Sequence, residues 1–242
     1  MKEYHVFYAP ELPENLQLPE EEAIHAIRVL RMKEGDAILA TDGRGHTYEG
    51  VLAEVSKKLC RMEIRRQEAI ASGWHGRIEL AVAPTKNMDR MEWFAEKATE
   101  VGVDEIVFLD CRNSERRVVK TERIEKIVVS AMKQSHKAAK PIVTSMTPFQ
   151  DFIRRPFEGQ RFICHCYDDS DVGTTAPMLF DVLNVAGAAQ VLIGPEGDFS
   201  IEEVRAAISE GFRPVSLGAS RLRTETAALC AVHMMFLKKM KR

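Results

Sequence analysis

Two glycine-bearing segments near the end of the chain combine residue types that a small-molecule site requires. The first, residues 191–200, reads VLIGPEGDFS and places two glycines and a proline directly after an apolar run. Glycines allow the main chain to approach a ligand closely, and proline stiffens the turn. The segment matches neither a P-loop nor a G-x-G-x-x-G dinucleotide fingerprint. Taken alone, it is as consistent with an ordinary turn between a strand and a helix as with a ligand loop.

The second segment, residues 215–228, reads VSLGASRLRTETAA and again leads from an apolar run into a glycine. It carries Arg221 and Arg223 at the beginning of a predicted helix. Thr224 is expected to cap that helix. The negative charge of Glu225 in the first turn interacts favourably with the positive end of the helix dipole. The functional interpretation places an arginine opposite an anion or an RNA, beside the small-molecule loop. The alternative is a solvated loop with incidental arginines, which the segment alone slightly favours.

The composition is that of a folded globular protein without a strong overall charge. The 242 residues are 45% hydrophobic and 29% charged, and 34 basic against 36 acidic side chains give a net charge of −2. These values exclude gross disorder and a polycationic protein, so any RNA binding must rely on local basic patches. Because the sequence has no basic and apolar leader and no apolar run of about 20 residues, we expect a soluble, cytoplasmic protein.

Five cysteines are spread along the chain, an odd number that does not fit a secreted disulfide framework. Only residues 164–166, Cys-His-Cys, resemble a fragment of a metal site, and no second ligand pair follows at a suitable spacing. They lie within an apolar run, residues 161–167. We therefore predict that they belong to a buried strand and that the protein has no metal site.

Short strands and one helix are predicted for the first 70 residues or so. Apolar residues at helical spacing predict a helix over residues 21–31. Runs of β-forming residues between turns predict strands over residues 4–8, 37–41, 47–55 and 59–66. Short strands in so small a segment favour a compact barrel, and residues 71–73 are the expected linker. We therefore expect one domain over residues 1–71 and a second over residues 74–242.

From residue 77 onward strand and helix patterns alternate, which is typical of an α/β domain with a mainly parallel sheet. The predicted strands are residues 78–83, 105–109, 142–144, 162–167, 190–193 and 214–217. The predicted helices are residues 89–101, 122–137, a segment beginning at 147, 200–211 and 224–239. Thr147 and Gln150 are expected to form a capping box around Pro148. Ser200 and Glu203 are expected to form another.

Together the two glycine-bearing segments resemble the closing motifs of the SPOUT (trefoil-knot) RNA methyltransferases. More narrowly, they resemble the bacterial family that methylates N3 of one uridine in small-subunit (16S) ribosomal RNA. The family pattern G-P-E-G-G-F-[ST] corresponds to residues 194–200, and the pattern L-G-x-R-I-L-R-x-E-T-A to residues 217–227. Further similar segments follow in the family's order at residues 25–36, 86–103, 114–116 and 134–135 and at Pro141.

Three departures from the family pattern bear on the site. Asp198 replaces a glycine, so we expect this position to accept a side chain and a negative φ. Ser220 and Arg221 replace the usual Arg-Ile pair, which moves one positive charge by one residue. Lys137 stands where an arginine is common. These changes leave both segments in place and affect mainly the predicted RNA contacts.

The resemblance implies a C-terminal α/β trefoil-knot methyltransferase domain and a small N-terminal PUA-like β-barrel domain that binds RNA. It also implies S-adenosyl-L-methionine as the cofactor, ribosomal RNA within the small ribosomal subunit as the partner, and a homodimer. The last predicted helix carries an apolar stripe of Leu229, Val232, Met235 and Phe236. From its spacing, this stripe is as consistent with ordinary core packing as with a dimer face.

The resemblance assigns cofactor binding to the main chain of the two glycine-bearing segments. The cofactor-binding residues it implies are Leu192, Ile193, Gly194, Pro195, Glu196, Gly197, Leu217, Gly218 and Leu222. A neutral uracil N3–H is a poor nucleophile, so the reaction needs a general base or stabilisation of the developing anion. Arg223 is expected to stabilise the negative charge. Glu196 and Glu225 are both candidates for the base, and the sequence does not choose between them.

RNA binding requires local positive charge, and residues 112–140 carry nine basic against three acidic side chains. The predicted RNA-binding residues are His25, Arg28, Arg31, Lys33, Lys86, Arg116, Arg117, Lys137 and Arg221. His25 is equally consistent with a core histidine. Two other functions remain as alternatives: a related knotted methyltransferase acting on tRNA or a ribose 2′-hydroxyl, and a catalytically silent RNA-binding protein.

Overall fold

The computed structural model describes residues 5–241, which divide into two compact units. The first unit comprises the chain up to Ser72 together with Val129–Lys140. The second comprises Gly73–Val128 together with the chain from Pro141 onward. The strand predicted over residues 4–8 begins at Val6, and residue 4 itself lies outside the described residues.

The first unit is built on a four-stranded sheet of order β1-β2-β3-β4. Its strands are β1 (Val6–Tyr8), β2 (Ala37–Thr41), β3 (His46–Ser56) and β4 (Leu59–Ala69). β1 runs parallel to β2, whereas β2, β3 and β4 form the antiparallel meander that the turn pattern predicts. Buried side chains such as Phe7, Tyr48 and Leu52 form its core.

The helical segment of the first unit changes its winding part-way. The α-helix α1 (Glu20–Ile24) continues as a π-helical turn, η1 (His25–Val29), in which the Leu30 N–H donates to the His25 carbonyl at 3.1 Å. The predicted helix over residues 21–31 is therefore shorter and partly π-helical. His25 is exposed on this turn, which excludes the alternative of a core histidine.

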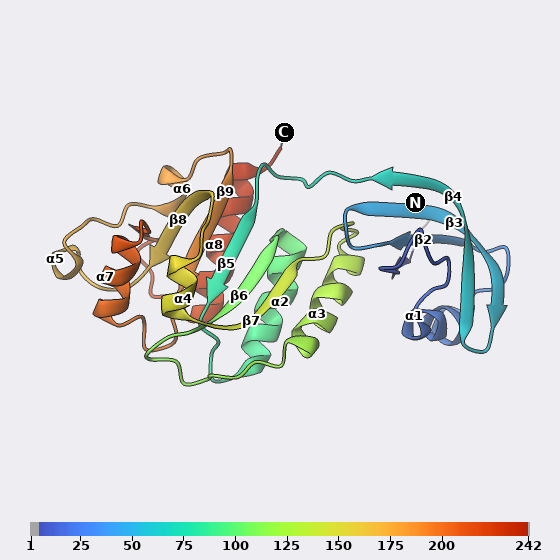
Figure 1. Cartoon of the computed structure of the whole chain (residues 1–242), viewed down its shortest axis with the longest axis horizontal. Helices are drawn as coiled ribbons and strands as arrows, with labels where there is room; N and C mark the ends of the chain where they lie inside the picture. Colours follow the sequence, from blue (N-terminus) through green and yellow to red (C-terminus); the bar gives the residue numbers. More distant parts are fainter. Residues whose placement is uncertain (1–4, 242) are drawn as a thin grey trace. The chain divides into compact units, whose positions relative to one another are not determined.

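The second unit contains a six-stranded sheet of order β10-β8-β9-β5-β6-β7, in which every neighbouring pair is parallel. Its strands are β5 (Ile78–Val82), β6 (Glu105–Asp110), β7 (Ile142–Pro148), β8 (Gly159–Cys164), β9 (Ala188–Ile193) and β10 (Arg213–Val215). The helices from residue 88 onward are α2 (Met88–Val101), α3 (Thr121–Gln134), α4 (Phe149–Arg154), α5 (Asp169–Val172), α6 (Leu179–Val182), α7 (Ile201–Ser209) and α8 (Thr224–Lys239). Figure 1 shows their arrangement. The predicted alternation is confirmed, and the short helices α5 and α6 are additions.

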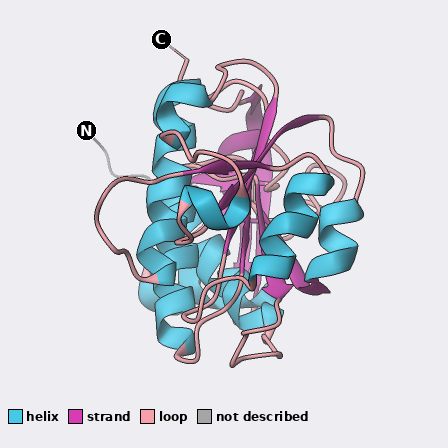
Figure 2. Ribbon diagram, turned by 90° about the vertical axis from the view of Figure 1, so that its left-hand side faces the viewer, coloured by secondary structure: helices cyan, strands magenta, loops and turns pink. Residues whose placement is uncertain are grey.

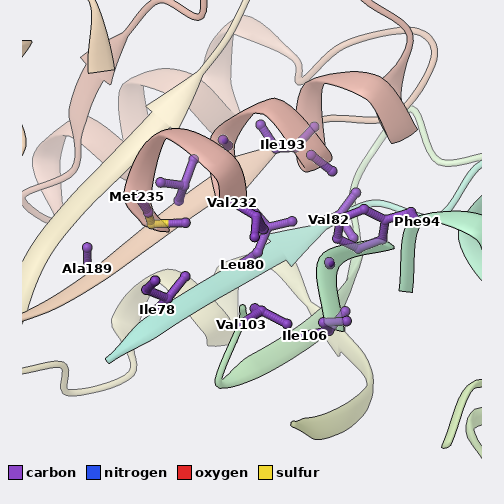
Figure 3. Close-up of a cluster of buried hydrophobic side chains, with 14 of the residues drawn as sticks. Ile78, Leu80, Val82, Phe94, Val103, Ile106, Ala189, Ile193, Val232 and Met235 are labelled. Atoms are coloured by element: carbon purple, nitrogen blue, oxygen red, sulfur yellow. The ribbon is translucent and has the colours of Figure 1, made fainter. Parts of the chain in front are cut away.

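Helices cover both faces of this sheet (Figure 2). On β5, Ile78, Leu80 and Val82 share one core with residues of α2 and α8, such as Phe94 and Met235 (Figure 3). The alternate β5 residue Ala81 belongs to a second core with side chains of α4 and α7. Burial on both faces explains why the central strands are apolar without interruption.

The apolar stripe of α8 packs within the second unit. Val232 and Met235 are fully buried in the core that they share with Ile78, Leu80 and Val82 of β5. Leu229 and Phe236 pack against the same core. The stripe therefore makes ordinary core contacts, while Leu237 on the same helix is 44% exposed.

One predicted helix start, at Thr147, and one predicted helix cap, at Thr224, are wrong, whereas the predicted bounds of the last helix, residues 224–239, are confirmed. β7 continues through Pro148, and α4 begins at Phe149 without a side-chain cap, so Thr147 and Gln150 form no capping box. β7 is an edge strand, where a proline is tolerated because its missing N–H breaks no inner ladder. α8 has Arg223, not Thr224, as its N-cap residue, because the extended backbone persists to Arg223.

Candidate functional site

A cavity of about 810 Å³ lies in the second unit, where the strands β8, β9 and β10 end. Both glycine-bearing segments line it, which confirms that they meet in space. The lining residues are Arg90, Cys164, His165, Cys166, Ile193, Gly194, Pro195, Glu196, Gly197, Asp198, Val215, Ser216, Leu217, Gly218, Ala219, Ser220, Arg221, Leu222, Arg223, Thr224, Glu225 and Ala227. Carboxyl ends of parallel strands are the usual place for ligands in open α/β sheets.

The first wall is the turn between β9 and α7. A Cβ atom added at Gly194 would lie 3.0 Å from the Phe199 backbone nitrogen, so glycine is needed for this close approach. The predicted capping box that ends the turn is confirmed. The Glu203 N–H donates to Ser200 Oγ at 3.2 Å, and the Ser200 N–H donates to Glu203 Oε2 at 2.8 Å.

Asp198 ties this wall to the segment that follows β8. Its Oδ1 accepts from the Phe199 N–H and its Oδ2 from the Cys166 N–H, both at 2.7 Å. Its φ is +60°, so the expected negative φ is wrong. Aspartate is among the few non-glycine residues that adopt the left-handed region readily, and the two hydrogen bonds stabilise it there.

The Glu196 side chain anchors the same turn to a distant part of the chain. The Lys86 N–H donates to Glu196 Oε1 at 3.0 Å. Arg116 in turn donates from Nε and Nη2 to the Lys86 carbonyl, at 3.1 and 2.6 Å. Asn113 Nδ2 donates to the carbonyls of Gly197 and Asp198, at 3.3 and 3.1 Å. Glu196 and Arg116 therefore both support the shape of the loop.

The second wall is the turn between β10 and α8. Gly218 has a φ of +120°, a conformation that side chains rarely tolerate, and its N–H donates to Ser216 Oγ at 3.1 Å. Arg221 and Arg223 are exposed, and Leu222 is half-buried. The N-terminal end of α8 and the two arginines make this side of the cavity electropositive.

Glu225 is the one buried carboxylate among the described cavity-lining residues, with 8% of its surface exposed. Its Oε1 lies 3.8 Å from Nε of Arg90 on α2. Its Oε2 has no hydrogen-bond partner within the described part of the chain. Buried polar atoms normally have partners, so such an exception requires an explanation.

Several predicted site residues lie elsewhere. Leu192 is fully buried in the core toward α4 and α7, because neighbouring strand residues point to opposite faces, and it is not part of the cavity lining. The predicted RNA-binding residues of the first unit, Arg28, Arg31 and Lys33, are exposed like His25. Lys137 is half-buried, and burial lowers the pKa of its ammonium group.

The predicted RNA-binding residues of the second unit already make contacts within the protein. Lys86 Nζ lies 3.1 Å from Glu115 Oε2, and Arg117 is ion-paired with Asp110. The side chains of Lys86 and Arg117 are more than half exposed, so water screens these ion pairs and each pair contributes little stability. Arg116 is half-buried in the loop support described above.

Sequence reasoning missed Arg90 and the segment that follows β8 as cavity-lining residues. β8 ends at Cys164, so His165 and Cys166 leave the strand and turn toward the cavity, contrary to the predicted strand over residues 162–167. Burial raises the pKa of the Cys164 thiol. Within residues 5–241, no group of three or more His, Cys, Asp or Glu side chains is arranged to hold a metal ion.

Two protein-family models together match most of the chain. The model of the RNA methyltransferase domain matches residues 73–236, and that of the RNA methyltransferase PUA domain matches residues 18–64. The chain belongs to the RNA methyltransferase family. The predicted family and fold class, an α/β knot methyltransferase domain with a PUA-like domain, are thereby confirmed.

Known relatives of this RNA methyltransferase span nearly its full length. A probable rRNA-methyltransferase from Porphyromonas gingivalis is 44% identical, with a TM-score of 0.90 over 97% of this chain and 98% of that one. A ribosomal RNA small subunit methyltransferase E from Neisseria gonorrhoeae, bound to S-adenosyl methionine, is 28% identical, with a TM-score of 0.83 over 95% of each chain. The enzyme of that name from Rickettsia conorii is 25% identical over 96% of this chain and 94% of its own.

The described helices of this RNA methyltransferase include none with the length and apolar character needed to cross a membrane.

Proposed function

We propose that this RNA methyltransferase transfers a methyl group from S-adenosyl-L-methionine to N3 of a uridine in small-subunit (16S) ribosomal RNA. The observation that carries the proposal is that both glycine-bearing segments line one cavity at the carboxyl ends of the strands. The relatives support it, since several are named ribosomal RNA small subunit methyltransferase E and one is bound to S-adenosyl methionine.

The cavity fits such a cofactor in size and in chemistry. Its volume lies in the range of about 300–1,000 Å³ that is usual for small-molecule sites. Gly194 permits the close approach to the Phe199 backbone nitrogen that shapes the first wall, and Gly218 permits the positive φ of the second. The residues that would hold the cofactor are Ile193, Gly194, Pro195, Glu196, Gly197, Leu217, Gly218 and Leu222, with Leu192 supporting them from the strand. When bound, it supplies an electrophilic methyl group on a sulfonium centre.

The protein's own contribution is to position the uracil ring and to stabilise the charge that develops on it. Removal of the N3 proton leaves negative charge on the uracil oxygens. Arg223 lines the cavity at the N-terminal end of α8, where a guanidinium can donate two parallel hydrogen bonds to such an anion. Most of the remaining acceleration comes from holding the reacting atoms in line.

Exposed basic side chains in each unit provide the proposed RNA contacts. In the first unit these are His25, Arg28, Arg31 and Lys33, and in the second Lys86, Arg117 and Arg221. Arg116 and Lys137 are less accessible and contribute chiefly through local structure and charge. Phosphate contacts of this kind make affinity fall as the salt concentration rises.

The organisation that accompanies this function is also a proposal. We assign residues 1–71 to the RNA-binding PUA-like domain and residues 74–242 to the catalytic domain, although Val129–Lys140 belong to the first compact unit. The protein acts as a homodimer on ribosomal RNA within the small ribosomal subunit, in the cytoplasm.

Nucleoside analysis tests the reaction directly. Ribosomal RNA from a bacterial strain lacking this gene should lack 3-methyluridine, and restoring the gene should return it. Methylation found on a ribose or in tRNA would favour the related methyltransferases instead. Calorimetry with S-adenosyl-L-methionine separates catalysis from a silent RNA-binding protein, because the latter would show no binding at millimolar cofactor.

A further inference from the structure

The geometry points to Glu225 as the group that accepts the N3 proton of the target uridine, with Arg90 as the residue that positions its carboxylate. This inference rests on the proposed function and chooses between the two candidate bases. It starts from one observation: the buried Glu225 lines the cavity and keeps one carboxylate oxygen without a hydrogen-bond partner among the described residues.

Glu196 is the less suitable candidate because its carboxylate is already used. Its Oε1 accepts the Lys86 N–H at 3.0 Å, in a chain of contacts that continues to Arg116. Its side chain is also exposed to solvent, where water competes for the same oxygens. Moving Glu196 toward a substrate would release the loop that shapes the first wall. The structure therefore gives Glu196 a positioning role.

Glu225, unlike Glu196, is buried and has a carboxylate oxygen without a hydrogen-bond partner among the described residues. Leaving a buried polar atom without a partner costs about 1–3 kcal/mol, and more for a charged group. A substrate N–H directed at Oε2 would recover that cost, since it supplies the missing donor. Oε2 itself is enclosed in this structure, so the Glu225 carboxylate has to turn toward the cavity to meet that donor. Glu225 lies two residues after Arg223 at the same end of α8.

Arg90 holds the carboxylate without occupying the vacant oxygen. Its Nε lies 3.8 Å from Oε1, beyond hydrogen-bond distance but close enough for charge attraction. Arg90 therefore orients the carboxylate by charge attraction and makes no hydrogen bond to Oε2.

The proposed step balances in protons and electrons. The N3–H bond breaks and its proton forms an O–H bond with Oε2 of Glu225. The electron pair left on N3 forms the new bond to the methyl carbon. The bond between that carbon and sulfur breaks, and its electron pair stays on sulfur, which becomes a neutral thioether. The proton on Glu225 then passes to water when the product leaves.

The decisive variant is Glu225→Gln, which keeps the shape of the side chain but cannot accept the proton. We expect turnover to fall by about 10²–10⁴-fold, as for loss of a general base. Cofactor affinity by calorimetry and the melting temperature should stay near wild-type values. Glu202→Gln is the matched control, since Glu202 occupies the first turn of α7 and lies outside the cavity lining.

A more acidic substrate should rescue this variant. RNA carrying 5-fluorouridine at the target position loses its N3 proton more easily, because fluorine withdraws electrons from the ring. Glu225→Gln should therefore recover most of its lost rate on that RNA, and on ordinary RNA as the pH is raised. A purely structural role for Glu225 predicts no such recovery and would overturn the inference.

The pH comparison must be made between wild type and variant, because other titratable and charged side chains face the same cavity. These are Arg90, Cys164, His165, Cys166, Glu196, Asp198, Arg221 and Arg223. All of them are present in both proteins, so a difference between the two profiles belongs to Glu225.

Arg90 is tested by the same measurements. Arg90→Ala should lower turnover at neutral pH and be rescued by 5-fluorouridine, whereas Arg90→Lys should retain most of the wild-type rate. If Glu225→Gln does not fold, Glu225→Asp and the Arg90 pair replace it. Wild-type protein that makes no 3-methyluridine would refute the proposed function itself. Wild-type activity with an unimpaired Glu225→Gln would refute only this inference.

Discussion

The two ends of the parallel sheet both gather charged side chains, but they use them in opposite ways. Near the amino ends of the strands, Glu79 on β5 pairs with Arg155, and Glu105 on β6 pairs with Arg77. At the carboxyl ends, the described ion pairs of Glu225 include one arginine, Arg90, at 3.8 Å. Oε2 of Glu225 and Oε2 of Glu79 both lack a hydrogen-bond partner within the described residues, but only Glu225 lines the cavity. The two carboxylates therefore differ in their surroundings: Arg77 and Arg155 enclose Glu79, whereas Glu225 lies beside one arginine and a cavity.

The amino-end cluster is closed by further contacts. Gln190 Nε2 donates to Glu79 Oε1 at 2.7 Å, and Thr144 Oγ1 donates to Glu105 Oε1 at 2.6 Å. Arg77 Nη2 lies 3.5 Å from the other oxygen of Glu79. Burial, together with the charge of Glu105, raises the pKa of Glu79 despite these partners. This cluster is structural, and perturbing it should affect stability and not chemistry.

The largest effect expected from this comparison is that of a substitution in the cavity at the carboxyl ends of the strands. Arg223→Ala should lower turnover by about 10²–10³-fold, the usual loss when one group that stabilises a developing anion is removed. Arg223 is exposed, so the free energy of unfolding and the cofactor affinity should change little. Single-turnover kinetics and calorimetry measure these quantities. Arg221→Ala is the matched comparison and should weaken RNA affinity more than turnover; an unchanged turnover in Arg223→Ala would remove that residue from the mechanism.

The converse test is a substitution in the charged cluster near the amino ends of the strands. Arg155→Ala leaves the Glu79 carboxylate buried with one fewer cation, and should lower the free energy of unfolding by about 3 kcal/mol. Arg154→Ala is the control, because the pair of Arg154 with Glu210 is exposed and its loss should cost less than about 1 kcal/mol. Denaturant unfolding measures both. Equal losses, or a loss of turnover per folded molecule in Arg155→Ala, would contradict the division between the two ends.

A matched pair of glycine variants sharpens the description of the cavity. At Gly194 a Cβ atom would lie 3.0 Å from the Phe199 backbone nitrogen, whereas at Gly197 the nearest atom is 3.4 Å away, on a side chain. Gly194→Ala should therefore displace the first wall and weaken cofactor binding about tenfold, or 1.4 kcal/mol. Gly197→Ala should weaken it less. Calorimetry decides, and equal affinities would show that the close approach at Gly194 does not shape the site.

The smallest effect concerns Asp198. Asp198→Ala removes both backbone hydrogen bonds and places alanine at a φ of +60°, which should cost about 1–2 kcal/mol. Asp198→Asn keeps one acceptor oxygen and a residue that tolerates this φ, so it should cost less. Thermal unfolding of the two variants measures the difference. Identical costs would show that the backbone conformation is not what selects aspartate here.

Features that depend on neighbours in the sequence were predictable. The alternation of strands and helices follows from hydrophobic periodicity, and the Ser200–Glu203 capping box is confirmed because its groups lie three residues apart. The helix start near Thr147 and the cap of the last helix were not, because β7 extends through Pro148 and Arg223, not Thr224, is the N-cap residue of α8. Tertiary contacts there outweighed local capping preferences.

The sequence by itself determined the two glycine-bearing segments and the residue types that a methyl-transfer site needs, since these depend on composition and spacing. It determined the family through the resemblance of those segments to known motifs. Only the tertiary structure brought Arg90 and Cys166 to the cavity and gave Asp198 its positive φ. It also separated the two candidate carboxylates, because the contact that occupies Glu196 comes from Lys86, 110 residues away. Whether a polar atom is satisfied depends on such distant partners, and no local pattern in the sequence records them.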